Sequence, residues 1–210
     1  MKNFIKNNKK LIKVIIICFF FSGLIFFLEN IDITVDKPLN LPNALQVDKC
    51  NLSGKREKNV VVDIGVDTSK INREYLAYTN EFGQLVKVEA KELILQTTPE
   101  ELSNGRYCND EAKVPGTEKK DYDEGHVIAD SLGGASNAYN ITPQKSNVNR
   151  KGGQQYELEQ EFLKILKEKG TIKNVIVNIE YENNETQIPS KYFFSWEQNG
   201  SHRKLEFENK

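Results

Sequence analysis

Acidic, glycine, histidine and amide residues gather in one part of this chain at spacings that could support hydrolytic chemistry. Residues 123–126 read DEGH, residues 140–144 read NITPQ, and Asn149 follows shortly afterwards. The imidazole of His126 can accept a proton near neutral pH, and amide oxygens suit a hydrated cation such as Mg²⁺. These residues could activate water beside a metal ion to hydrolyse a phosphodiester. The alternative is a polar loop around a surface histidine, a common outcome for short motifs.

The same spacing resembles the DNA/RNA non-specific endonucleases of the ββα-metal (His-Me finger) superfamily. Their signature is D-R-G-H, then N-x-x-P-Q, then an Asn that opens a helix and a Glu on that helix. Residues 123–126 and 140–144, Asn149 and Glu157 match it in order. One position departs from the pattern, since Glu124 replaces the arginine and removes any phosphate contact that the arginine would make.

Sequences flanking the motifs extend the resemblance over residues 72–200 and point to a secreted or membrane-anchored branch that includes DNA-entry nucleases. YTNEFG at residues 78–83, the glycine pair at 133–134, Tyr181 and IPS at 188–190 all fit this branch. The resemblance implies a metal-dependent endonuclease that cleaves DNA and RNA without reading sequence.

The resemblance assigns the two central roles to His126 and Asn149. His126 would be the general base that deprotonates water, with its second ring nitrogen oriented by a backbone carbonyl. Asn149 would hold Mg²⁺, or Mn²⁺ in its place, with water and phosphate oxygens as the other ligands. An asparagine before a helix could also serve only as its N-cap.

Supporting roles fall to five further residues. Asp123 is expected to brace its turn by hydrogen bonds. Asn140 and Gln144 are expected to orient water on the metal or to contact substrate. Glu157 would reach the metal through water, and Glu159 replaces it if the glycines at 152–153 shift the register of the helix.

Basic residues beside these motifs are few. Lys145, Arg150 and Lys151 form a cluster, to which Arg106 could add, and they are expected to contact phosphate groups without reading bases. Each of them could equally be an ordinary solvated surface residue. Residues 31–210 hold 24 basic and 29 acidic side chains, a net charge of −5, which is unusual for a protein that binds polyanions.

The N-terminus is expected to be a membrane segment. Five lysines up to Lys13 precede Val14–Leu28, which is 15 residues without a charge. With residues 11 and 12 included, the segment 11–28 reaches the lower limit for a membrane span, and the lysines should stay in the cytoplasm. The competing interpretation is a cleaved signal peptide. Residues 1–30 would be this segment, 31–70 a spacer, and 71–210 the endonuclease domain on the outer face of the cell membrane or secreted.

Two of the three cysteines lie in the part of the chain expected to be exported. Cys50 and Cys108 are compatible with one disulfide, as extracellular proteins often have. Two free buried thiols are the alternative.

Sequence patterns predict an α+β fold with an antiparallel sheet, one main helix and a ββα-metal core. Residues 75–78 and 85–90 alternate around a glycine turn and predict a hairpin. Residues 154–169 have a helical apolar stripe, and residues 174–181, 191–197 and 204–207 alternate as strands. A short strand is expected near residues 59–64, and a long loop over 96–122 with a short helix near 99–102.

Two other function classes remain open at this stage. One is a membrane-tethered receptor that binds nucleic acid without cleaving it. The other is a nuclease toxin effector that is neutralised by an immunity or inhibitor protein, with the same chemistry and a different biology.

Overall fold

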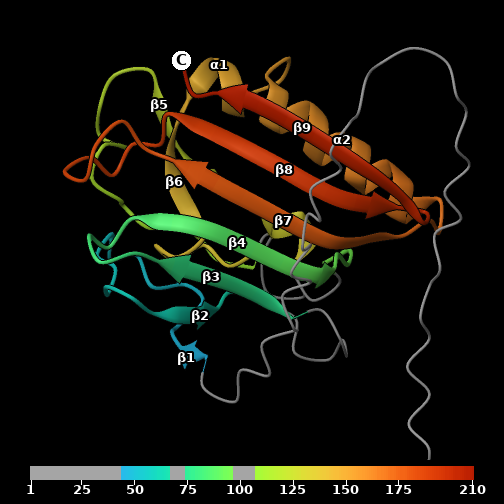
Figure 1. Ribbon diagram of the computed structural model, residues 1–210, viewed down its shortest axis with the longest axis horizontal. Helices are drawn as coiled ribbons and strands as arrows, with labels where there is room; N and C mark the ends of the chain where they lie inside the picture. The colour runs from blue at the N-terminus through green and yellow to red at the C-terminus, as the bar shows by residue number, and fades with distance from the viewer. Residues whose placement is uncertain (1–43, 67–73, 97–106) are drawn as a thin grey trace, which may run out of the picture. The chain divides into compact units, whose positions relative to one another are not determined.

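The computed structural model describes residues 44–66, 74–96 and 107–210. Most strands form one seven-stranded sheet in the order β1-β2-β3-β4-β7-β8-β9 (Figure 1). Its strands are β1 (Leu45–Gln46), β2 (Val61–Asp63), β3 (Tyr75–Thr79), β4 (Leu85–Glu92), β7 (Ile172–Glu180), β8 (Lys191–Gln198) and β9 (Ser201–Glu208). Only β1 and β2 run parallel, and each other neighbouring pair is antiparallel.

Helix α2 (Gln154–Lys167) packs on one face of this sheet and runs alongside β8 and β9 (Figure 1). Leu158, Phe162 and Ile165 recur at helical spacing and are buried in the main hydrophobic core. The ring of Phe162 meets Trp196 of β8 edge to face, with centroids 5.2 Å apart. The sheet and this helix confirm the α+β class.

A separate two-stranded sheet carries the chemical motifs. It consists of β5 (Tyr122–His126) and β6 (Ile141–Lys145), between which lies the 3₁₀ turn η1 (Asp130–Leu132). The short helix α1 (Ser146–Asn149) follows β6 directly, and four residues separate it from α2. Thr142 of β6 is hydrogen bonded to Tyr192 of β8 at 2.8 Å in the protein interior, which attaches the small sheet to the large one.

Position 125 must be glycine because the side chain of Gln144 crosses β5 there. A Cβ atom at this position would lie 2.3 Å from Cδ of Gln144, which pairs with Asp123 on the neighbouring strand. The glycine of the DEGH motif therefore makes room for a buried glutamine. This requirement, and not a turn, explains its place in the motif.

Several sequence predictions are confirmed and others are corrected. The 75–92 hairpin, α2 and strands β7 to β9 lie close to where they were expected, and the short strand near 59–64 is β2. The DEGH motif was expected to be a turn, but it is strand β5. The expected helix near 99–102 lies outside the described residues, and residues 107–121 have no helix or extended strand.

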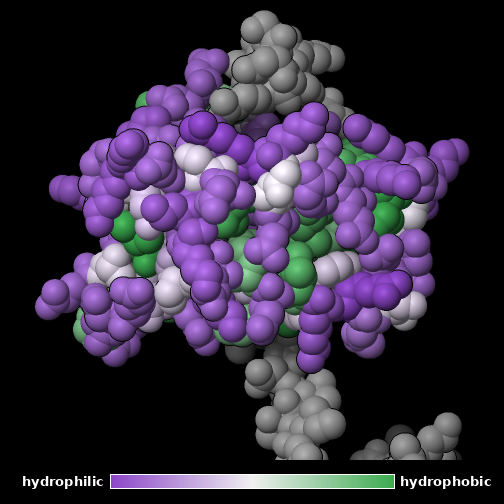
Figure 2. Space-filling view, turned by 90° about the horizontal axis from the view of Figure 1, so that it is seen from above, coloured by the Kyte–Doolittle hydropathy of each residue, from purple (hydrophilic) through white to green (hydrophobic). Residues whose placement is uncertain are grey.

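Residues 44–66 belong to the folded unit, although they fall in the predicted spacer 31–70. β2 pairs with β3, β1 pairs with β2, and the compact unit begins at Leu41. Leu45 and Leu52 remain exposed in this segment, together with Phe82 elsewhere. The face shown in Figure 2 is largely hydrophilic, and hydrophobic side chains reach its surface only in small areas between polar ones.

The predicted membrane segment, residues 11–28, lies outside the described residues. Within the described part of the chain, no helix has the length and apolar character needed to cross a bilayer.

Candidate active site

Asp123 is the centre of a hydrogen-bond cluster that joins β5 to α1. Its carboxylate accepts hydrogen bonds from Ser146 Oγ (3.0 Å), Asn149 Nδ2 (3.3 Å), and Arg150 Nη2 (2.6 Å) and Nε (2.9 Å). Burial opposes ionisation of the carboxyl, but the hydrogen bonds from Arg150, Ser146 and Asn149 outweigh it and hold the pKa of Asp123 below its ordinary value. Asp123 is therefore a carboxylate at neutral pH, in the bracing role expected for it, although it braces a strand and a helix instead of a turn.

Asn149 is half-buried, and its orientation is set by Asp123. A carboxylate can only accept, so the amide nitrogen must face it. Oδ1 consequently lies on the other side of the amide group, where it is positioned to act as a ligand. Asn149 is the last residue of α1, so the prediction that it caps the main helix is wrong.

The break between the two helices explains that error. α2 has Gly153 at its N-cap, and a Cβ there would lie 2.2 Å from the carbonyl oxygen of Val148. Only glycine lets the chain pass this close to the end of α1. Asn149 therefore ends α1, and α2 begins separately with Gly153 as its N-cap.

His126 ends strand β5 and is half-buried. Its Nε2 lies 3.1 Å from the hydroxyl oxygen of Ser136. Its backbone carbonyl oxygen accepts hydrogen bonds from Gln155 Nε2 (3.1 Å) and Gln144 Nε2 (3.3 Å). The backbone and the ring of this residue are thus held by different parts of the fold. His126 is three residues along the strand from Asp123, which corresponds to roughly 10 Å.

Asn140 and Gln144 are completely buried, which corrects the expectation that they contact substrate. Asn140 accepts from Ile128 N (3.0 Å) and donates to the carbonyl oxygens of Ile128 and Ala135 (2.8 Å each). Its amide group is used entirely to shape the connection between β5 and β6. Gln144 acts from inside the protein, on the His126 carbonyl.

Glu157 and Glu159 lie in the first turns of α2 but point to different surroundings. Glu157 is exposed and accepts a hydrogen bond from the backbone N of Gly152 at 3.1 Å. Glu159 accepts from Gln155 Nε2 at 2.8 Å and borders a small apolar cavity with Phe162. Burial raises the pKa of Glu159 to about 7. The exposed Glu157 matches a solvent-side role, whereas the carboxyl of Glu159 borders an apolar cavity, which does not favour it as the replacement.

The basic residues around the motifs are partly engaged. The guanidinium of Arg150 forms a salt bridge with Asp123, and Lys145 lies over the Tyr122 ring with its ammonium 4.4 Å from the centroid. Lys151 is exposed at the break between the helices, and Arg106 lies outside the described residues. The structure therefore gathers Lys145, Arg150 and Lys151 near α1, with Lys151 as the most accessible.

Glu124, which departs from the family signature, has a basic partner. Its carboxylate is 3.4 Å from the ammonium of Lys113, which also binds Asp110 at 2.9 Å. Strand alternation places Glu124 on the same face of β5 as His126. The face beside the histidine thus carries an ion pair.

The donor set fits a magnesium ion held by few protein atoms. Among the residues that the structure describes, no three His, Cys, Asp or Glu side chains come together as a metal cluster. Mg²⁺ keeps most of its water shell and binds through one or two protein oxygens. Asn149 Oδ1, which lies on the side of its amide group away from Asp123, offers one hard oxygen of this kind.

A family model for DNA/RNA non-specific endonucleases matches residues 65–200, which include every motif of this site. The chain belongs to this family. Its curated relatives include the type VII secretion system protein EssD of Staphylococcus aureus strain USA300, 28% identical over 132 residues. That match covers 60% of this chain but only 21% of EssD, so the chain spans about a fifth of the relative's length.

Solved structures of NucA from Streptococcus agalactiae share the endonuclease fold. The structure with no metal bound has a TM-score of 0.51 at 15% identity and covers 74% of this chain and 82% of NucA. The structure with a magnesium ion bound has a TM-score of 0.50 at 15% identity and covers 70% and 78%. At this identity the likeness establishes the fold alone.

Sequence reasoning missed two residues that contact His126. Ser136 lies in a loop of small residues, and nothing in its sequence context signals a contact ten residues back along the chain. Gln155 resembles the other polar residues of α2. A buried face that includes position 155 could have been found from the helical periodicity with Leu158 and Phe162.

Proposed function

We propose that this chain is a Mg²⁺-dependent endonuclease that hydrolyses phosphodiester bonds of DNA and RNA without sequence preference. The observation that carries the proposal is that the fold holds each of the two motif residues, His126 and Asn149, through named hydrogen bonds. Asp123 orients the Asn149 amide, and Ser136, Gln144 and Gln155 hold His126. Family membership supports the reaction class.

His126 is the general base. Hydrolysis needs water to lose a proton as its oxygen attacks phosphorus, and imidazole performs this transfer effectively near neutral pH. The contacts that fix both the ring and the backbone of His126 reduce the freedom it would lose on reaching the reactive geometry.

Asn149 holds the metal through Oδ1, and Asp123 keeps that oxygen directed outward. When bound, Mg²⁺ supplies positive charge that stabilises the pentacovalent transition state and the departing oxygen. Magnesium in one NucA structure supports this choice of ion. Glu157 lies in the first turn of α2 and is exposed, so it is accessible for a contact through water.

The substrate is held by its backbone. Lys145, Arg150 and Lys151 can contact phosphates, which carry no sequence information. Two open hollows of about 480 and 500 Å³ lie nearby around Lys191 and Lys210, and neither His126 nor Asn149 lines them. His126 and Asn149 are half-buried, so their side chains are partly accessible to a polymer passing over the surface.

The nuclease acts outside the cell, held by residues 11–28 or released after their cleavage. A basic flank before a long apolar run supports export with the N-terminus inside. Export keeps an enzyme without sequence specificity away from the genome of its own cell.

A toxin effector with an immunity partner is a second candidate. The relative EssD carries the name of a type VII secretion system protein, which favours a secreted role. A receptor without catalysis is less well supported, because the residues that hold His126 and Asn149 are all present.

The decisive experiment is incubation of the full chain, purified in mild detergent, with plasmid DNA and with RNA in the presence of Mg²⁺ or EDTA. Cleavage of both polymers with Mg²⁺ and none with EDTA is expected. No cleavage under any metal condition, together with retained binding of nucleic acid, would establish the receptor instead.

A further inference from the structure

Ser136 has each of its polar groups tied to a different part of the protein. Its hydroxyl lies 3.1 Å from His126 Nε2, its backbone N donates to the Lys49 carbonyl at 3.1 Å, and its carbonyl accepts from Ala112 N at 2.8 Å. The residue is completely buried. The position of the hydroxyl relative to the imidazole is therefore set by two backbone contacts and does not depend on a mobile side chain.

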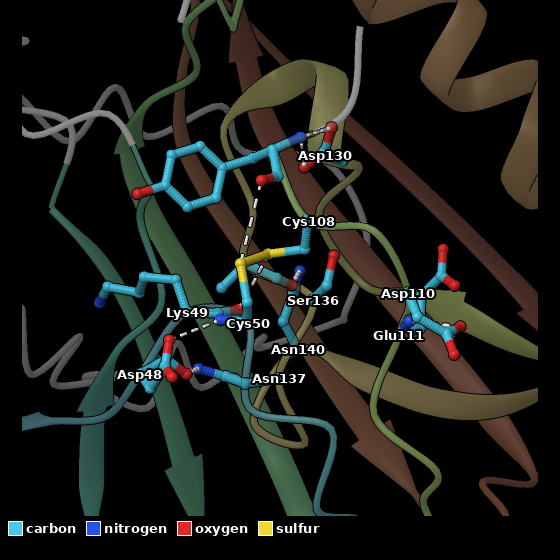
Figure 3. The surroundings of a disulfide bond; sticks show 12 residues. Asp48, Lys49, Cys50, Cys108, Asp110, Glu111, Asp130, Ser136, Asn137 and Asn140 are labelled. Atoms are coloured by element: carbon cyan, nitrogen blue, oxygen red, sulfur yellow. Dashed lines mark hydrogen bonds between the residues drawn. A yellow bond between two sulfur atoms is a disulfide. The ribbon is translucent and has the colours of Figure 1, made fainter. Parts of the chain in front are cut away.

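One of these contacts comes from a segment cross-linked by the disulfide. Cys50 and Cys108 are joined, with their Cα atoms 5.4 Å apart, and Ser136 and Asn137 lie beside the bond (Figure 3). Asn137 Nδ2 donates to the Asp48 carbonyl at 3.2 Å, so two successive residues of the β5–β6 connection bind residues 48–50. This segment lies outside the residues 65–200 that match the family.

We propose that Ser136 is a positioning residue for His126, and that residues 48–50, cross-linked to Cys108, hold Ser136 in place. The inference rests on the proposed role of His126 as general base. It makes the catalytic geometry depend on a part of this chain that the family motifs do not include.

The physical reason is the choice of imidazole tautomer. A neutral imidazole carries an N–H on one ring nitrogen and a basic lone pair on the other. A hydrogen-bond partner at one nitrogen determines which of the two carries the proton. When the Ser136 hydroxyl accepts from Nε2–H, the basic lone pair lies on Nδ1. Without the hydroxyl, the ring loses this preference and one restraint on its rotation.

The two histidines of the chain allow a direct test that needs no activity. The full chain, labelled with ¹⁵N in histidine and purified in detergent, gives signals for His126 and for His202, whose side chain is 83% exposed on β9. Ser136→Ala should change the proportion of the two His126 tautomers and leave His202 unchanged. Ser136→Thr, which keeps a hydroxyl, should restore the proportion, and Ser201→Ala on exposed β9 is the matched control.

Kinetics on a short DNA duplex provide the second readout. Ser136→Ala should lower kcat about 10- to 100-fold, the usual range for removing a group that orients a reactive residue, while KM changes by less than about 3-fold. A wild-type tautomer ratio and wild-type kcat in Ser136→Ala would overturn the proposal. Absence of cleavage by the wild-type chain would refute the proposed function alone, since the tautomer measurement still tests the positioning.

Reduction tests the role of the cross-link. Dithiothreitol transfers two electrons and two protons to the Cys50–Cys108 bond, giving two thiols, and becomes a cyclic disulfide. The reduced chain should show the tautomer shift and kcat loss of Ser136→Ala, with no further loss when both changes are combined, and should recover on reoxidation.

If the reduced chain unfolds, Asn137→Ala still tests whether residues 48–50 hold Ser136 in place. This variant removes the hydrogen bond to the Asp48 carbonyl, together with the one that Asn137 Oδ1 accepts from Tyr139 N, and leaves the disulfide intact. It should shift the His126 tautomers in the same direction. Unchanged tautomers in folded Asn137→Ala, or in a folded reduced chain, would overturn the role of residues 48–50.

Discussion

His126 and Asn149 perform their proposed roles from the ends of different elements, since His126 ends strand β5 and Asn149 ends helix α1, which follows β6. His126 is held through Ser136 at its ring and through two buried glutamines at its carbonyl. Asn149 is held through Asp123 alone, with a single hydrogen bond of 3.3 Å. Loss of either side chain should therefore affect catalysis without dismantling the core.

His126→Ala should lower the rate of hydrolysis by at least about 100-fold, since removal of a general base costs on this scale. The fold should persist, with a loss of roughly 1 kcal/mol because the buried Ser136 hydroxyl is left without its ring partner. Cleavage rates and thermal melting of both proteins check this. A folded variant that cleaves at the wild-type rate would rule out His126 as the base.

Asn149→Ala should raise the Mg²⁺ concentration needed for cleavage, or abolish cleavage, because it removes the proposed metal-binding oxygen. Since Asn149 caps no helix, melting should change little. Asn147→Ala is the matched control, because Asn147 is exposed on the same helix and binds the Lys210 carbonyl instead. Equal Mg²⁺ titrations for all three proteins would assign Asn149 a structural role only.

At the scale of the elements, α2 links the site to the core through the buried Gln155 and the half-buried Glu159. Gln155 Nε2 donates both to the His126 carbonyl and to Glu159. Burial raises the pKa of Glu159 from 4.5 to about 7 in the folded state. The protonated carboxyl therefore favours folding, so this stability is fully present below pH 4.5 and is lost as the pH rises through about 7.

Glu159→Gln should remove this pH dependence, because glutamine stays neutral. Between pH 4.5 and 7.5 the free energy of unfolding of the wild type should fall, relative to the variant, by on the order of 2 kcal/mol. Urea unfolding across this range measures the difference, and Glu161→Gln on the exposed side of the same helix is the control. Parallel curves for wild type and Glu159→Gln would mean that the carboxyl ionises normally.

The elements that the sequence revealed were those with strong periodicity. β3, β4 and α2 alternate or repeat clearly enough to be placed within a few residues. β5 and β6 were not recognised, because a polar strand containing Gly125 pairs with one containing Pro143, and neither has an apolar alternation. Their pairing depends on Gln144 and Tyr192, contacts across distant parts of the chain that no local pattern reports.

The candidate site divides in the same way. His126, Asn149 and Asp123 were identified from motif spacing, and the structure gives each a plausible position. The same reasoning expected Asn140 and Gln144 to orient water on the metal or to contact substrate, because sequence distinguishes residue types but not burial. The contact of Ser136 with His126 could not be predicted from the sequence, since it is created by the fold of residues 127–140.

At the scale of the whole molecule, the Cys50–Cys108 disulfide joins the N-terminal segment to the body of the domain across 58 residues. Cys50→Ser with Cys108→Ser should lower the free energy of unfolding by about 4 kcal/mol in the loop-entropy account. Chemical unfolding measures this, and intact mass before and after reduction establishes that two hydrogens are gained. A native mass that matches free thiols would contradict the bridge.

The distribution of charge also belongs to this scale. Residues 31–210 carry a net charge of −5, although their proposed substrates are polyanions. Attraction to nucleic acid must then come from the cluster near α1 and from the metal, and tethering would reduce the need for tight binding in bulk solution. The proposed membrane anchor would thus explain how a domain with this net charge can act on nucleic acid.

That proposal predicts a specific topology for the full chain. The lysines up to Lys13 should remain in the cytoplasm while Val14–Leu28 crosses the membrane, which places the nuclease domain outside. Cells that express the full chain should therefore retain it in the membrane fraction, and protease added outside should digest the domain. Release of a species shorter by about thirty residues would establish a cleaved signal peptide, which is excised in this way. Protection from protease in intact cells would place the domain inside, and a nuclease that reads no sequence would then need an inhibitor to spare the genome.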